Sequence, residues 1–305
     1  MEATIFVRRR SPLTAAPPQP GGCPGRAPTR ARTSDVDLSS PQQATGVAIL
    51  RAISEPAPYL RHEGPLAFAH RGGGHEAPEN TLAAFERAVS LGFRYLETDA
   101  RLTADGVVVA FHDPVLDRLT DRSGRIADLD WTEVAAARVH GIEPVPRLAD
   151  VLGAWESVRF NIDPKCDEVV EPLARLVRDL GMVERVCFGS FKARRTARLG
   201  GILGPEVCRS LGPLGVARLW LRSRGVPVPV RAGPAGCVQV PARIEGRALV
   251  DRRFVEAAHR RGLQVHVWTV NDAGHMHRLL DLGVDGLMTD RPSVLRRVLE
   301  ARGAW

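Results

Sequence analysis

Lysine is almost absent from this chain of 305 residues. Of its 42 lysine and arginine residues, only Lys165 and Lys192 are lysines. Because arginine serves as the general cation of the chain, a retained lysine indicates a position that needs a compact ammonium group. Lys165 is for this reason a candidate functional residue before any motif is considered.

Long apolar runs are absent as well. No stretch approaches the roughly 20 consecutive apolar residues that a membrane-spanning helix requires. Arg8, Arg9 and Arg10 lie near the N-terminus, but the apolar segment of a secretory signal does not follow them. These absences argue against an integral membrane protein and against secretion, so we expect a cytoplasmic protein.

The five cysteines lack the short spacings of a metal-binding motif, and their number is odd. Cys187, Cys208 and Cys237 fall in stretches with strand character, where a buried thiol usually serves as a small hydrophobic side chain. We therefore expect core cysteines rather than a cysteine metal site. Unpaired cysteines also agree with a reducing cytoplasm.

The excess positive charge is concentrated in one segment. The net charge of the chain is +7, and residues 192–231 contain nine basic residues but only one acidic residue. The basic residues are Lys192, Arg194, Arg195, Arg198, Arg209, Arg218, Arg222, Arg224 and Arg231. Such a segment attracts phosphate, nucleic acid or acidic lipid, although a solvated arginine-rich face is the simpler interpretation. Aromatic residues are rarely interleaved with these cations and no nucleic-acid motif occurs, so we expect no nucleic-acid partner.

Residues 1–64 are rich in proline, arginine, serine and threonine, with little periodicity. We predict a disordered N-terminal extension here, in which only residues 47–53 have the pattern of a short helix. The folded domain is predicted to cover residues 65–305. No methionine occurs between Met1 and Met182, so translation from a downstream non-methionine codon is a hypothesis.

Nine stretches have the pattern of β-strands. They are residues 66–71, 93–102, 107–111, 158–165, 185–191, 206–211, 237–240, 264–270 and 286–290. The turn at residues 104–106 is too short for a crossover helix, so residues 107–111 should return antiparallel to the second strand. The other eight strands alternate with helices, and this count predicts an α/β protein of the (β/α)8 TIM-barrel class with a small hairpin excursion after strand two.

Short polar residues indicate where several helices begin, because they accept a hydrogen bond from the first helical turn. Asn80 or Thr81 is expected to cap the first helix, and Asp251 and Asn271 are expected to cap two later ones. Residues 116–141 have no helical or strand period and are expected to form an exposed stretch.

Polar residues lie where several of the predicted strands end, which is the edge that carries the active site of a TIM barrel. They are His70, Arg71, Glu97, Asp99, Asp163, Lys165 and Trp268. Three carboxylates at one barrel mouth resist ionisation unless a cation lies among them, and oxygen ligands suit a hard divalent ion. Glu97 and Asp99 follow apolar Leu96, which favours a metal site over a solvated pair of acids.

Five short motifs occur in order between residues 70 and 113. They are His70-Arg71-Gly72, Pro78-Glu79-Asn80-Thr81, Glu97-Thr98-Asp99, Thr103-Ala104-Asp105-Gly106 and His112-Asp113. In this order and at these spacings they resemble the glycerophosphodiester phosphodiesterase family. The resemblance extends over residues 66–299; it is dense up to Lys165, thin over residues 194–246 and clear again over residues 265–292. It implies the same TIM-barrel fold.

The resemblance also implies roles for matching residues. His70 and His112 match the acid/base pair, and histidine titrates in the range that both proton steps of phosphodiester cleavage need. Arg71 and Lys165 match phosphate-binding residues, and Trp268 matches a tryptophan that lines the glycerol side. Which histidine is the base stays open, as does the choice between water and a neighbouring substrate hydroxyl as the nucleophile.

The metal ligands follow from the same resemblance. Glu97 and Asp99 match the family's metal-binding pair, and Asp163 matches a third acidic ligand that is most often a glutamate. The shorter side chain of Asp163 departs from that pattern and leaves the third metal bond in doubt. The expected cofactor is one divalent cation, either Mg2+ or Ca2+.

The expected function is metal-dependent hydrolysis of glycerophosphodiesters to glycerol 3-phosphate and an alcohol. One alternative is a lysophospholipase D-like enzyme that takes lipid substrates at a membrane surface, because residues 214–224 mix apolar and arginine side chains. A second alternative is a non-catalytic anion-binding module, against which the complete acid/base and carboxylate set argues. The alcohol group and the oligomeric state stay open.

Overall fold

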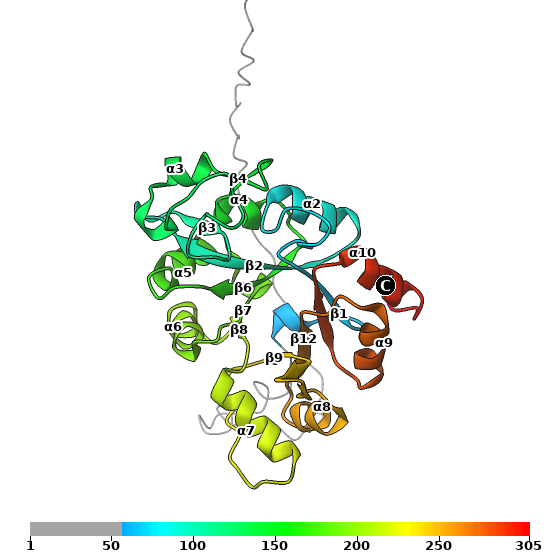
Figure 1. Cartoon of the computed structure of the whole chain (residues 1–305). Helices are drawn as coiled ribbons and strands as arrows, with labels where there is room; N and C mark the ends of the chain where they lie inside the picture. Colours follow the sequence, from blue (N-terminus) through cyan, green and yellow to red (C-terminus); the bar gives the residue numbers. More distant parts are fainter. Residues whose placement is uncertain (1–56) are drawn as a thin grey trace, which may run out of the picture. The chain divides into compact units, whose positions relative to one another are not determined.

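Eight parallel strands form a nearly closed ring in the computed structural model, which describes residues 57–305 (Figure 1). In chain order they are β1 (Leu66–His70), β2 (Tyr95–Leu102), β6 (Arg159–Pro164), β7 (Val186–Phe188), β8 (Cys208–Arg209), β9 (Cys237–Pro241), β12 (Gln264–Trp268) and β13 (Gly286–Thr289). The order around the ring is β8-β7-β6-β2-β1-β13-β12-β9. A single bridge between Ser210 and Cys237 joins its two ends. The predicted (β/α)8 TIM barrel is confirmed.

Helices lie outside this ring and connect its strands (Figure 1). They are α2 (Leu82–Ser90), α4 (Leu148–Gly153), α5 (Val170–Asp179), α6 (Ala193–Leu203), α7 (Pro213–Ser223), α8 (Arg252–His259), α9 (Ala273–Asp281) and α10 (Pro292–Glu300). Thr81 caps α2 and Asp251 caps α8, as predicted. The predicted cap of α9 was wrong, because Asp272 rather than Asn271 accepts the hydrogen bond from the first turn.

The hairpin excursion after β2 is also present. Strand β3 (Val108–Ala110) pairs antiparallel with β2, with Ala100 opposite Ala110. The pairing returns the chain to the mouth of the barrel, where His112 follows β3.

The stretch at residues 116–141 is exposed at many positions, as predicted, but it also has secondary structure and buried apolar side chains. This segment contains the 3-10 helix η2 (Ile126–Asp128), helix α3 (Trp131–Ala135) and strand β4 (Arg138–Val139), which pairs with β5 (Glu143–Pro144). Its apolar side chains are buried in a small second core against Phe111. They occur at irregular spacings because loops and single turns carry them, and no single helix or strand period reveals their burial.

The floor of the barrel is closed from the N-terminal side of the strands. Residues 58–60 form the 3-10 helix η1 (Pro58–Leu60), in which Tyr59 is fully buried. The hydroxyl of Tyr95 donates to the carbonyl oxygen of Tyr59 at 2.9 Å. These residues precede the predicted domain boundary at residue 65 and are ordered. Residues 1–56 of the predicted extension, including residues 47–53, lie outside the described residues.

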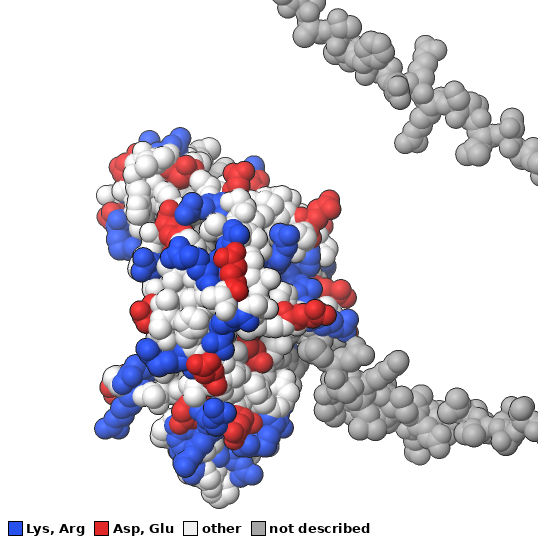
Figure 2. Space-filling view, turned by 90° about the vertical axis from the view of Figure 1, so that its right-hand side faces the viewer, with Lys and Arg blue, Asp and Glu red and all other residues white. Residues whose placement is uncertain are grey.

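Four of the nine basic residues of the arginine-rich segment are paired with acidic neighbours. Arg194 and Arg195 contact Asp167, and Arg224 contacts Asp251 at 2.9 Å. Figure 2 shows lysine and arginine side chains interspersed with aspartate and glutamate over one face. Within residues 57–305, none of the helices has both the length and the apolar character needed to cross a bilayer.

Candidate active site

A cavity of about 880 Å³ opens at the carboxyl ends of the strands. All eight residues that the sequence predicted for the site line it: His70, Arg71, Glu97, Asp99, His112, Asp163, Lys165 and Trp268. Strand register brings several of them together, because paired residues of neighbouring parallel strands face the same side of the sheet. His70 is paired with Glu97, and Asp99 is paired with Asp163.

The turn after β1 directs Arg71 into the cavity. Arg71 has a φ of 53°, and Gly72 and Gly73 that follow also have positive φ. A Cβ atom on Gly72 would lie 2.8 Å from the Cβ of Ala84, so only glycine fits against α2 at this point. The turn brings the backbone N–H of Arg71 to the carboxylate of Glu97, to which it donates at 3.1 Å.

His70 is held by a carboxylate that the sequence interpretation missed. Its Nδ1 lies 2.6 Å from Oδ1 of Asp290, and Asn271 donates from Nδ2 to the other carboxylate oxygen at 2.9 Å. Burial lowers the pKa of His70, but the charge of Glu97 and the hydrogen bond to Asp290 outweigh it and raise this pKa overall. Asp290 directly follows β13, so the rule that selected the other strand-end residues could have identified it.

His112 has a carboxylate partner of a different kind. Its Nδ1 lies 2.6 Å from Oδ1 of Asp113, but Arg118 donates to Oδ2 of the same carboxylate at 2.5 Å. The Arg118 hydrogen bond lowers the pKa of Asp113 to about 2. Burial, with Lys165 and Arg71 nearby, lowers the pKa of His112 despite its acidic neighbours.

Two cations lie among the carboxylates. Lys165 Nζ is 2.8 Å from Asp99 and 2.7 Å from Asp163, and Arg71 Nε is 3.2 Å from Asp99. Although burial raises the pKa of Asp99, these two cations lower it to about 2. Burial and the charge of Asp99 raise the pKa of Glu97 to about 7, so Glu97 is the carboxylate that the side-chain cations compensate least.

The carboxylates of Glu97, Asp99 and Asp163 offer the hard oxygen donors that Mg2+ and Ca2+ prefer. The raised pKa of Glu97 fits a site that would take a further cation. The three donors do not converge here: within residues 57–305, only a cysteine cluster places three or more potential ligand atoms within 4.8 Å of one another. Lys165 lies between Asp99 and Asp163, so binding by all three acids would require its ammonium group to leave Asp163.

One side of the cavity is apolar. Trp268 stacks edge-on with Phe191, at 5.7 Å between ring centroids, and Val216 and Trp220 of α7 line the same wall. A short hairpin of β10 (Arg243–Ile244) and β11 (Arg247–Ala248) contributes Ile244. Trp268 is the only residue of this wall that was predicted as a site residue. Val216 and Trp220 belong to residues 214–224, whose mixed composition suggested a membrane surface instead.

Comparisons with known proteins identify the family. A sequence profile described as "Glycerophosphoryl diester phosphodiesterase family" matches residues 70–294. A Mycobacterium tuberculosis protein named "Probable glycerophosphodiester phosphodiesterase 2" is 41% identical over 254 residues, covering 81% of this chain and 95% of that protein. A "Glycerophosphodiester phosphodiesterase" of Caldanaerobacter subterraneus subsp. tengcongensis is 28% identical over 259 residues, with 78% and 99% covered.

A solved structure agrees with these sequence matches. The crystal structure of glycerophosphodiester phosphodiesterase from Agrobacterium tumefaciens has a TM-score of 0.62 and 29% identity, covering 76% of this chain and 99% of that one. The resemblance inferred from the five motifs is thereby confirmed. The chain belongs to the glycerophosphoryl diester phosphodiesterase family and is an enzyme of that class.

Proposed function

We propose that this enzyme hydrolyses glycerophosphodiesters to glycerol 3-phosphate and an alcohol by histidine acid/base catalysis. The observation that carries the proposal is the pair of carboxylate-bound histidines, His70 and His112, on one cavity with Arg71 and Lys165. Phosphodiester cleavage needs a base for the nucleophile and an acid for the leaving alkoxide, and histidine serves both steps near neutral pH.

Arg71 and Lys165 are proposed to bind the phosphoryl oxygens. Both are partly buried and both contact Asp99, so a bound phosphate would share cations that already lie in the cavity. Charge on the phosphoryl oxygens is stabilised most strongly by cations that are positioned before substrate arrives. Glu79 accepts from Arg71 Nη1 at 2.9 Å and restricts the position of its guanidinium group.

The partners of the two histidines support a division of roles. Asp290 is hydrogen-bonded to a neutral amide and keeps its negative charge for His70, which favours a protonated imidazole ready to act as the acid. Asp113 is neutralised by Arg118, so His112 is held mainly as the neutral imidazole that a general base requires. We therefore infer that His112 is the base and His70 the acid.

Glu97, Asp99 and Asp163 are proposed to hold one divalent cation, Mg2+ or Ca2+. When bound, such an ion would offset negative charge on the phosphate. Arg71 and Lys165 would then position the phosphate, and the two histidines would transfer the protons.

Replacement of either catalytic histidine should abolish turnover without unfolding the barrel. His70→Ala and His112→Ala are expected to lose about 10²- to 10⁴-fold in kcat, the usual contribution of a positioned acid or base. Glycerol 3-phosphate release from glycerophosphocholine measures this, and circular dichroism checks the fold. His259→Ala, an exposed histidine of α8, serves as the control and should keep full activity. Activity near the wild-type value in either cavity variant would contradict the proposal.

Separate limbs of the pH profile should respond to the two carboxylate partners. Loss of Arg118 in Arg118→Gln frees the charge of Asp113, stabilises protonated His112 and raises its pKa, so the acidic limb of kcat/KM moves up by about one unit. Asp290→Asn removes a charge that stabilises protonated His70, lowers its pKa and moves the basic limb down by about one unit. If Asp290→Asn moves the acidic limb instead, the two roles are reversed.

Removal of divalent ions should stop the reaction. EDTA is expected to abolish glycerol 3-phosphate release, and Mg2+ or Ca2+ titrated back identifies the ion that restores it. Asp163→Glu lengthens the third ligand to the family's usual one and should lower the ion concentration needed for half-maximal activity. Asp163→Asn is the matched control and should raise it, since it removes one negative charge. Full activity in EDTA would disprove the metal proposal.

A lysophospholipase D-like activity is a second candidate, favoured by the apolar wall. Phe191 is 72% exposed, Leu214 65% and Ile244 51%, and Phe191 and Ile244 line the cavity. An acyl chain would bury these side chains together with the wall formed by α7.

Trp220→Ala should distinguish the two substrate classes. Because Trp220 lines the apolar wall, we expect about a tenfold lower kcat/KM for lysophosphatidylcholine and little change for glycerophosphocholine. Trp131→Ala, which lies in the small second core away from the cavity, is the matched control. An equal loss on both substrates, or no turnover of the lysolipid by the unchanged enzyme, would exclude this candidate.

A further inference from the structure

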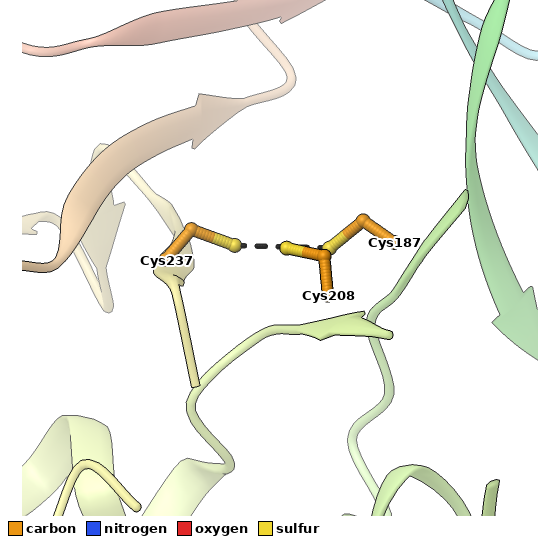
Figure 3. A group of neighbouring side chains, drawn as sticks. All are labelled: Cys187, Cys208 and Cys237. Atoms are coloured by element: carbon orange, nitrogen blue, oxygen red, sulfur yellow. Dashed lines mark hydrogen bonds between the residues drawn. The ribbon is translucent and has the colours of Figure 1, made fainter. Parts of the chain in front are cut away.

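Three cysteines from three neighbouring strands meet inside the barrel (Figure 3). Cys187 lies on β7, Cys208 on β8 and Cys237 on β9, and each is at most 1% exposed. Their sulfur atoms all lie within 4.8 Å of one another, and the sulfurs of Cys187 and Cys237 are 3.8 Å apart. Figure 3 shows the three side chains directed toward one another.

The three thiols face the barrel interior. They pack with Phe68 and Met288, whereas Val186 and Phe188, on either side of Cys187, belong to the core between strands and helices. The closure of the ring produces the cluster, because β8 pairs with β7 and its end bridges to Cys237.

A buried histidine beside the cluster has an unused ring nitrogen. His266 on β12 is fully buried, and its Nδ1 has no hydrogen-bond partner. Its Nε2 lies 3.1 Å from Oε1 of Gln264, and the amide nitrogen of Gln264 donates to the carbonyl oxygen of Leu60. This orientation of the amide assigns the ring proton to Nε2 and leaves a free lone pair on Nδ1.

Strand pairing places His266 near the thiols. Strand β12 runs beside β9, with Gln264 opposite Cys237. A buried ring nitrogen that accepts no hydrogen bond destabilises the folded state unless a ligand binds it. Histidines that bind metals commonly donate their other ring N–H to a neighbouring acceptor, as His266 does.

We propose that Cys187, Cys208 and Cys237 form a structural site for one thiophilic cation, Zn2+ or Cu+. Only the three sulfurs already lie within 4.8 Å of one another, so the imidazole of His266 would have to shift toward them to supply Nδ1 as the fourth ligand. This site is separate from the carboxylates at the barrel mouth and does not depend on the proposed catalytic function. On binding, the metal displaces thiol protons to solvent, up to three for Zn2+, and gains sulfur and nitrogen ligands. Soft thiolate ligands select such ions against Mg2+ and Ca2+.

The sulfur separations fit this coordination. Two ligands about 2.3 Å from a tetrahedral zinc ion are about 3.8 Å apart, which is the distance between the sulfurs of Cys187 and Cys237. The third sulfur is within 4.8 Å of both, so it must move by about 1 Å or less.

The position of the site predicts a structural role. Gln239 donates to Asn161 at 2.8 Å, and both side chains line the catalytic cavity, whereas none of the three cysteines lines it. The proposed ligands come from β7, β8, β9 and β12, and the ion would join strands on both sides of the single bridge that closes the ring. Because the thiols are buried, we expect the metal to enter while the chain folds.

Metal content tests the proposal directly. The full chain is produced in medium supplemented with zinc, copper or cobalt, kept reduced, and dialysed against EDTA to remove ions from the open carboxylate site. Elemental analysis should find about one zinc or copper ion per chain. Cobalt-grown protein should show thiolate-to-cobalt charge-transfer absorption, which carboxylate ligands do not give.

Variants identify the ligands. Cys208→Ser and Cys237→Ser should lose the retained metal and the charge-transfer band, and His266→Gln should alter the band. Cys166→Ser, a cysteine outside the cluster, and Asp99→Asn, at the barrel mouth, should keep both. The metal-loaded protein should melt about 5–10 °C above the metal-free protein.

Three results would overturn the proposal. One is wild-type protein that retains no more metal than a variant with all three cysteines changed to serine. Another is a mass lower by two hydrogens, which would show a disulfide in place of a metal site. The third is a charge-transfer band that persists in Cys208→Ser and Cys237→Ser. If those variants do not fold, the metal content and cobalt spectrum of the unchanged chain still decide.

Discussion

The mouth of this barrel depends on balancing negative charge that cannot reach water. Asp99 is 1% exposed and Glu97 is 5% exposed, and the strand register brings Asp163 beside Asp99. Lys165 bridges the two aspartates, and leaving such a buried charge without its partner typically costs about 3–5 kcal/mol. The scarcity of lysine in the chain therefore has a structural counterpart, because one of its two lysines contacts two carboxylates of the site.

The same balance makes the two histidines unequal. Both have a carboxylate 2.6 Å from Nδ1, so distance alone does not distinguish them. The difference lies one contact further away, where Asp290 meets an amide and Asp113 meets Arg118. Two histidines can thus differ in how readily they are protonated, because the neighbour of each partner carboxylate decides how much of its negative charge acts on the imidazole.

Much of the fold and most of the cavity could be predicted from the sequence. The eight strands alternate with helices, and His70 and Asp163 stand where β1 and β6 end, whereas Glu97 lies within β2. Asp290 also stands at a strand end, but its contact with His70, 220 residues away in the sequence, exists only in the closed ring. Asn271 is of a residue type that often caps helices, but its side chain is hydrogen-bonded to Asp290 and Thr289. Only the closed ring brings these two residues near Asn271.

Other features depend on contacts between distant parts of the chain. The apolar residues of the small second core have no common period, so only their packing against Phe111 shows that they are buried. The cysteines are far apart in sequence, and the spacing rules for metal motifs apply to ligands on one turn or hairpin. In a closed ring, the order of the strands decides which residues are neighbours. A short sequence pattern cannot predict that order.

Donor chemistry separates the two ends of the barrel interior. The mouth offers carboxylate oxygen, which suits hard cations, and the floor offers thiol sulfur and an imidazole, which suit soft ones. Asn161 and Gln239 line the catalytic cavity and are hydrogen-bonded to each other, so they add amide groups rather than charges to its wall. A barrel with these two sets of donors could bind a catalytic ion and a structural ion at once. The type of donor atom at each site, oxygen or sulfur, would then decide which ion binds there.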